Sequence, residues 1–124
     1  MLETLAPDEA VALFRSGKAF FVDVRTEKEF LKRAIPGSPL VPLDRLEREG
    51  RLDDSLSGKP VVFFCRSGRR TQDKAELLER AVRGKAYQLG GGILAWEQAG
   101  FPVWSPRELR PCFAASPCAS GVFA

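Results

Sequence analysis

The sequence predicts an α/β domain in which a mostly parallel sheet lies between helices. Three short apolar runs, at residues 19–24, 61–64 and 86–89, have the length and the flanking turn residues of buried strands. Segments with a helical spacing of apolar residues alternate with these runs along the chain. Strands that alternate with helices pair in parallel, with helices on both faces of the sheet.

The chain begins with a predicted helix and strand. Pro7 occupies the first helical position, two acidic residues follow it, and Gly17 ends the helix. The run at 19–24 is too short for a helix and is bounded by turn residues, so it is expected to be a buried strand. Thr26 then caps a short helix, with Glu29 three residues later as in a capping box.

Prolines and glycines divide the middle of the chain. Residues 35–39 contain two prolines and are expected to form an irregular turn, because proline fits neither a helix interior nor a central strand. Asp44 and Glu47 predict a second cap, opening a short helix that Gly50 closes. Turn residues then precede the strand at 61–64.

The remainder of the predicted domain repeats the pattern of helix, strand and helix. Apolar side chains recur at helical spacing over residues 75–82, and Gly84 ends that helix. A short strand at 86–89 and a turn of three glycines follow. The last predicted helix spans 93–98 and ends at Gly100.

The composition fits one soluble domain and excludes several kinds of site. The 124 residues suffice for a single core. The net charge of +3 comes from basic residues interspersed with acidic ones, which indicates a solvated surface and no nucleic-acid partner. The chain has no histidine, which excludes Cys-His proteases, Ser-His-Asp hydrolases and histidine-ligated metals. Its three cysteines include no C-x-x-C pair, so we expect no disulfide framework, no metal and no cofactor.

No segment of the sequence predicts export or membrane insertion. The chain opens without a charged leader followed by an apolar core, and no apolar run approaches about 18 residues. We therefore expect a cytoplasmic protein without a membrane partner, in which a reactive thiol stays reduced.

Residues 65–70, Cys-Arg-Ser-Gly-Arg-Arg, are the strongest candidate for a functional site. They join the strand at 61–64 to a helix, so backbone N–H groups of the loop and of the helix start converge on one point. The three arginines have no acidic neighbour before Asp73. Because such surroundings favour a thiolate at neutral pH, Cys65 is a candidate nucleophile in an anion-binding loop.

The loop and three further motifs resemble the rhodanese family of sulfurtransferases. Four residues separate Cys65 from Arg70, whereas cysteine phosphatases have a larger loop, with one more residue, that fits a tetrahedral phosphate. The resemblance extends over about residues 5–103. Its other motifs are Phe-Val-Asp-Val-Arg at 21–25 with Glu-Phe at 29–30, Ile-Pro-Gly-Ser at 35–38, and the glycine-rich segment 89–96 with 99–103.

This resemblance implies a rhodanese-like α/β fold, with a central, mostly parallel sheet of about five strands and helices on both faces. The rhodanese-like domain is expected at residues 1–104. Residues 105–124 contain three prolines, small residues, Cys112 and Cys118, and are expected to form a flexible C-terminal tail. The alternative is a tail with a redox-active or sulfur-accepting cysteine.

The resemblance also implies that sulfur is transferred through a persulfide on Cys65. The thiolate attacks the outer sulfur of a donor such as thiosulfate, sulfite leaves, and a thiol acceptor, for example on a thioredoxin-like protein, or cyanide takes the sulfur. An arginine-rich loop favours thiosulfate over 3-mercaptopyruvate. Arg66 and Arg69 are expected to face the incoming anion, and Arg70 to fold back and brace the loop. The residues expected to bind the substrate are Arg66, Ser67, Gly68, Arg69 and Arg70.

Asp23, Arg25 and Thr71 are expected to support the loop. Asp23 is expected to bond nearby backbone, and Arg25 to pair with Glu29. Trp96 is expected in the core.

At Arg33 and Ala34 the chain departs from the family pattern, because many relatives have Gly-His before the Ile-Pro-Gly turn. That histidine is not the nucleophile or the base of the family, so its absence does not threaten sulfur transfer. Without this histidine, the family pattern does not predict the local packing or the polarity of the pocket. Arg33 would add positive charge near the site.

Two other functions remain open from the sequence. One is a persulfide carrier that binds a partner protein and has little turnover of its own. The other is an arsenate reductase or phosphatase on the same fold, against which the short loop argues.

Overall fold

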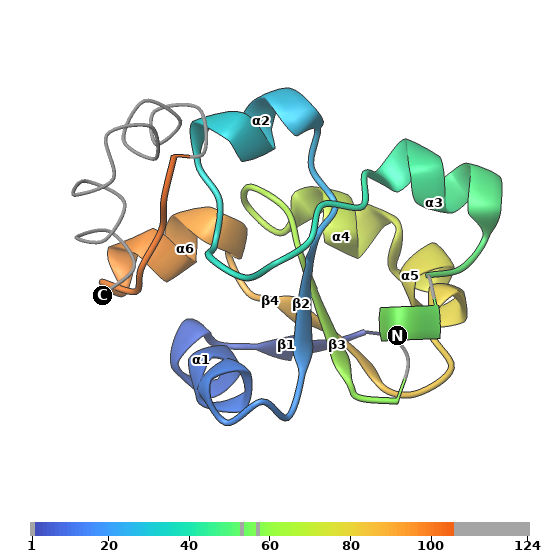
Figure 1. Cartoon of the computed structure of the whole chain (residues 1–124), viewed down its shortest axis with the longest axis horizontal. Helices are drawn as coiled ribbons and strands as arrows, with labels where there is room; N and C mark the ends of the chain where they lie inside the picture. The colour runs from blue at the N-terminus through green and yellow to red at the C-terminus, as the bar shows by residue number, and fades with distance from the viewer. Residues whose placement is uncertain (1, 53, 57, 106–124) are drawn as a thin grey trace.

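The computed structural model describes residues 2–52, 54–56 and 58–105, and within them four strands form one parallel sheet in the order β1-β4-β3-β2 (Figure 1). The strands are β1 (Glu3–Leu5), β2 (Phe20–Asp23), β3 (Val61–Phe64) and β4 (Ala86–Leu89). The predicted α/β class, with a parallel sheet flanked by helices, is confirmed.

The helices lie on both faces of the sheet. Figure 1 shows α1 and α6 on one side and α3, α4 and α5 on the other, and two separate hydrophobic clusters fill the two interfaces. The helices are α1 (Pro7–Arg15), α2 (Glu27–Lys32), α3 (Leu43–Glu49), α4 (Arg69–Asp73), α5 (Ala75–Ala81) and α6 (Gly92–Gln98), with a 3-10 turn at Asp54–Leu56.

Strand β3 is buried on both faces and leads directly to the candidate nucleophile. Val61 and Phe63 belong to the cluster under α3 and α5, whereas Val62 and Phe64 belong to the cluster under α1 and α6. Side chains alternate along a strand, so Cys65 continues the first set and lies in the same cluster as Phe63. The core therefore fixes the position of Cys65 through its neighbours on β3.

An aromatic cluster anchors α6 to the sheet. The ring of Trp96, which is fully buried as predicted, lies 5.4 Å from that of Phe21 and 5.0 Å from that of Phe101, measured between centroids. Its indole N–H donates to the carbonyl of Pro102 at 2.8 Å. Aromatic contacts of this kind contribute about 1 kcal/mol each beyond the burial of area. Helix α6 is therefore held firmly against the sheet.

The described residues contain four strands where about five were expected. β1, which the sequence pattern did not reveal, has three residues of which two are exposed. On the other edge Leu40 forms a single parallel bridge with Asp23. The flanking residues Pro39 and Pro42 lack the N–H groups that a longer ladder requires, so the fifth strand is reduced to this bridge.

Two helix boundaries also differ from the expectation. Helix α3 begins at Leu43 after Pro42, so Asp44 lies inside the first turn and the predicted cap at Asp44 is wrong. Gly50 ends α3 with φ of 78°, as predicted. The helix expected after the loop is divided into α4 and α5 at Lys74, whose φ of −110° and ψ of 23° are not helical.

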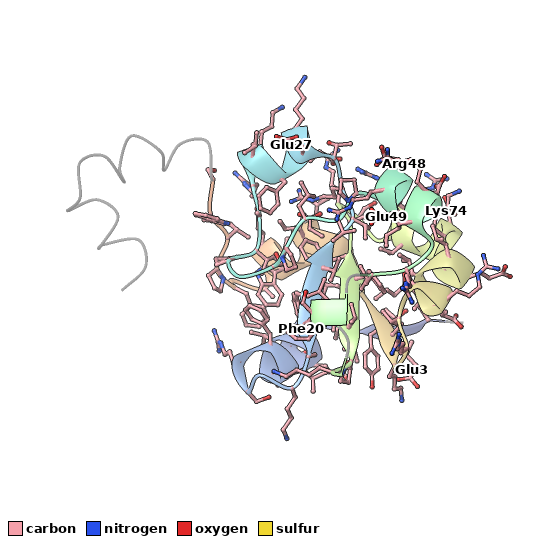
Figure 2. All side chains as sticks on the ribbon, turned by 45° about the vertical axis from the view of Figure 1, so that its right-hand side comes forward. Glu3, Phe20, Glu27, Arg48, Glu49 and Lys74 are labelled. Carbon is pink, nitrogen blue, oxygen red and sulfur yellow. The ribbon has the colours of Figure 1, made fainter. Side chains whose placement is uncertain are left out.

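The surface charges are mixed and solvated. Figure 2 shows the side chains of Arg48, Glu49 and Lys74 extending outward on the side of α3. Glu49 accepts from Arg45 at 2.7 Å, and Lys74 lies 3.4 Å from a carboxylate oxygen of α3. The described part of the chain contains no helix long and apolar enough to cross a membrane.

The end of the described chain is tied to the domain. Ala34 and Trp104 exchange two backbone hydrogen bonds of 2.8 and 2.9 Å, and the Ser105 hydroxyl donates to the carbonyl of Lys32 at 2.6 Å. The tail predicted at 105–124 lies, apart from Ser105, outside the described residues.

Candidate active site

Cys65 follows the last residue of β3 and is 1% exposed. Its Sγ accepts a hydrogen bond of 3.1 Å from the backbone N–H of Gly68. Gly68 has φ of 92°, a conformation that glycine adopts without strain. The loop therefore curls back onto the sulfur, and a main-chain donor stabilises negative charge there.

The loop is clamped by the first turn of α6. The N–H of Ile93 donates to the carbonyl of Cys65 at 2.9 Å, and that of Leu94 donates to the carbonyl of Arg66 at 3.1 Å. A Cβ at Gly92 would lie 2.4 Å from the Cys65 carbonyl oxygen, and Gly92 has φ of 62°. Only glycine permits this approach. The glycine-rich turn therefore also allows the start of α6 to pack closely against the loop.

Thr71 supports the loop from α4. Its hydroxyl donates to the carbonyl of Gly68 at 2.9 Å, and the same oxygen lies 3.9 Å from Sγ of Cys65. Thr71 is fully buried. Since its proton is used by Gly68, Thr71 holds the turn that presents the Gly68 N–H to the sulfur.

Arg70 and Glu29 form a two-pronged ion pair between α4 and α2. The two guanidinium nitrogens donate to the two carboxylate oxygens at 2.8 and 2.7 Å. The pair lowers the pKa of Glu29 to about 2 and raises that of Arg70. Glu29 also accepts from the N–H of Thr26 at 3.3 Å, as in the predicted capping box. Arg70 is thus held against α2 and braces the loop from outside.

Arg25 does not pair with Glu29, and that expectation is wrong. Its guanidinium donates to the Asp23 carboxylate through Nε at 2.9 Å and Nη2 at 2.7 Å, and Nη2 also donates to the carbonyl of Arg33. Asp23 and Arg25 are buried, at 0% and 4% exposure. Asp23 accepts as well from the backbone N–H of Arg25, as its strand-end position suggested. The two residues form a structural pair at the wall of the site.

Arg66 and Arg69 are exposed, and among the described residues neither forms an ion pair. They line two different hollows beside the loop. The first, here called the Arg66 groove, has a volume of about 600 Å³ and is lined by Arg33, Arg66, Ile93, Leu94, Glu97 and Ser105 among others. The second, the Arg69 pocket, has about 410 Å³ and is lined by Ser67, Gly68, Arg69, Gln88 and Gly91 among others.

Arg33, expected to add positive charge near the site, does line the Arg66 groove. It is paired with Glu97 of α6 through two hydrogen bonds of 2.8 and 2.7 Å, so its charge is largely balanced. Within the described ranges, no cluster of side chains could hold a metal ion. The positive charge available to an anion therefore comes from Arg66 and Arg69, together with Lys32, which also lines the Arg66 groove.

Comparisons with known proteins agree on one family. The family model of the rhodanese-like domain matches residues 6–99. A sulfurtransferase from Allochromatium vinosum is 32% identical over 85 residues, covering 68% of this chain and 78% of its own. An uncharacterized protein from Synechocystis is 34% identical over 100 residues, and the match spans 81% of this chain but only 55% of that protein.

The fold is also found in a solved structure. A rhodanese-related protein from Thermoplasma volcanium gives a TM-score of 0.70 with 21% identity, covering 82% of this chain and 97% of that one. This likeness concerns the fold alone, since the identity is low.

Proposed function

The chain belongs to the rhodanese-like domain family and is homologous to sulfurtransferases, and from that premise we propose that it moves a sulfane sulfur from thiosulfate through a persulfide on Cys65. One observation carries the proposal. The Cys65 sulfur accepts the Gly68 N–H inside a loop whose outer arginines, Arg66 and Arg69, have no ion-pair partner in the described part of the chain.

In the first half-reaction the Cys65 thiolate attacks the outer sulfur of thiosulfate. A bond forms between Sγ and that sulfur, the sulfur–sulfur bond of thiosulfate breaks, and sulfite leaves with the electron pair. The enzyme then carries one additional sulfur as a persulfide. No oxidant or general base is required, because the nucleophile reacts as a thiolate.

The charges favour a small anionic donor. Thiosulfate is a dianion and must approach an anionic sulfur, and fixed positive groups have to offset that repulsion. Arg70 is neutralised by Glu29, so it contributes little net charge. Arg66 and Arg69 remain, and they can provide charge-assisted donors in the two hollows that they line.

In the second half-reaction an acceptor thiolate attacks the outer sulfur of the persulfide and releases Cys65 as a thiolate. We propose a thiol on a partner such as a thioredoxin-like protein, with cyanide as the acceptor in an assay. A free thiol nucleophile requires a reducing compartment, for which the cytoplasm is the proposed location.

The test is a donor panel in steady state, with wild type and Cys65→Ser compared. Thiosulfate with cyanide should give continuous thiocyanate, 3-mercaptopyruvate should be a poorer donor, and a phosphatase substrate should not react. One equivalent of sulfite without turnover would instead support the persulfide carrier. Phosphate release that depends on Cys65 would refute sulfur transfer.

A further inference from the structure

The Arg66 groove is formed by α2, α6 and the loop that follows Cys65 (Figure 1). Its α6 side is bonded to the backbone of the candidate nucleophile. The N–H of Ile93 donates to the carbonyl of Cys65, and the N–H of Leu94 donates to the carbonyl of Arg66. A molecule that binds to α6 at Leu94 is therefore held at a fixed position beside Cys65.

The groove contains an apolar side chain that the core does not bury. Leu94 is 41% exposed, and it is the one exposed large hydrophobic residue within the described ranges. Leu31 of α2 also lines the groove and is half-buried. Single exposed leucines are common on protein surfaces, but Leu94 lies in a hollow that charged side chains surround. An apolar centre with a charged rim is the arrangement of a protein-binding surface.

The charged residues around Leu94 leave the groove positive. Those that are already held in ion pairs are Arg25, Glu29, Arg33 and Glu97. Lys32 and Arg66 are exposed, and in the part of the chain that the structure describes neither forms an ion pair. The groove thus presents two unbalanced positive charges next to one apolar side chain. Its complement is an acidic surface with an apolar side chain at its centre.

A thiol carried by a protein fits this groove better than a small thiol does. A small anion uses positive charge but gains nothing from an exposed leucine, whereas a protein surface contacts both at once. Arg66 can act in both half-reactions in turn, because sulfite leaves before the acceptor binds. The groove therefore suits the second half-reaction.

We propose that the Arg66 groove is the docking surface for the protein that accepts the sulfur, and that this partner presents acidic side chains and an apolar side chain beside its acceptor cysteine. The inference rests on the proposed function, because Cys65 must first form a persulfide. The acceptor thiolate, having lost its proton to solvent, attacks the outer sulfur. A bond forms between these two sulfurs, the bond to Cys65 Sγ breaks, and the electron pair leaves on Cys65. The groove thereby selects the acceptor, and the loop holds the sulfur.

The probes are short synthetic peptides with one cysteine each. The first has aspartates and a leucine around the cysteine, the second has lysines in place of the aspartates, and the third has serine in place of the leucine. Full-length protein is loaded with thiosulfate, the excess is removed, and mass spectrometry follows the sulfur on each peptide over time. The first peptide should take the sulfur about tenfold faster than either of the others, and added salt should remove its advantage over the lysine peptide.

Matched variants locate the contact. Lys32→Glu and Lys28→Glu make the same charge change on α2, but Lys32 lines the groove and Lys28 does not. Lys32→Glu should slow transfer to the first peptide about tenfold, and Lys28→Glu less than about twofold. Leu94→Ser should slow this transfer about fivefold without changing transfer to cyanide, which makes no apolar contact, whereas Leu94→Met should behave as wild type.

A binding measurement does not depend on sulfur transfer. The first peptide, with serine in place of its cysteine and a fluorescent label, should bind the unreacted protein, and Lys32→Glu should weaken this binding more than Lys28→Glu. If sulfur never reaches Cys65 but this binding is found, the proposed function fails and the docking surface stands. The docking surface is overturned if the peptide does not bind, if the acidic and lysine peptides accept sulfur equally fast, if the two lysine variants have equal effects, or if Leu94→Ser slows transfer to cyanide as well.

Discussion

The ion pair of Glu29 with Arg70 predicts a stability that depends on pH. Replacing Glu29 by Gln keeps an oxygen that can accept the Thr26 N–H but removes the charge facing Arg70. The pKa of Glu29 falls from 4.5 to about 2 in the folded protein. The folded state therefore binds this proton less tightly than the unfolded state. The contribution to stability is full above pH 4.5 and is lost as the pH falls towards 2.

The size of the effect follows from the geometry. A shift of this extent sets an upper limit of about 3 kcal/mol on the contribution of the ion pair to the free energy of unfolding. The side chains of Arg70 and Glu29 are 40% and 27% exposed, so solvent screens the pair. After that discount we expect Glu29→Gln to lower the free energy of unfolding by about 1 kcal/mol near neutral pH.

The assay is urea unfolding of wild type, Glu29→Gln and the control Glu27→Gln across the acid range. Glu27 lies in the same first turn of α2 and forms no ion pair among the described residues (Figure 2). The deficit of Glu29→Gln should shrink as the pH falls from 4.5 towards 2. If the two variants are equally stable, or if the deficit does not change with pH, the ion pair does not hold the loop as argued.

Four further variants test the site. Cys65→Ser should fold and lose all sulfur transfer, since a serine hydroxyl is neither ionised nor thiophilic; circular dichroism and thiocyanate formation check this. Arg69→Ala should lower kcat/KM for thiosulfate about tenfold at unchanged melting temperature, whereas Arg70→Ala should also lower the melting temperature, and identical profiles would mean that the roles are misassigned. Gly92→Ala should destabilise by about 2 to 4 kcal/mol through the clash with the Cys65 carbonyl and the strain of positive φ, which urea unfolding measures, and a neutral effect would contradict the clamp.

The central strands and the loop were predictable because they depend on local pattern. Residues 61–64 are apolar without interruption, and a strand buried on both faces requires such a run. β1 could not be found in this way, because two of its three residues are exposed and its pairing with β4 joins residues far apart in sequence. The break between α4 and α5 at Lys74 was likewise not predictable, because no glycine or proline marks this position in the sequence.

The partners of the charged residues were less predictable than the residues themselves. Arg25 stands four residues before Glu29, a helical spacing, but α2 begins only at Glu27, so Arg25 lies outside the helix. It turns instead to Asp23, which is on the same side of the extended chain. Glu29 instead pairs with Arg70, which is 41 residues away in sequence. The parallel sheet brings these two residues together.

The central claim is that the outer sulfur of thiosulfate is transferred to Cys65. Thiosulfate labelled at its outer sulfur with a heavy isotope, quenched within the first turnover and followed by peptide mass spectrometry, tests this claim directly. The label should appear first on the peptide with Cys65, in step with the release of unlabelled sulfite, and should be absent from all peptides of Cys65→Ser. Label that arrives first on another residue, or that persists in Cys65→Ser, would contradict the account.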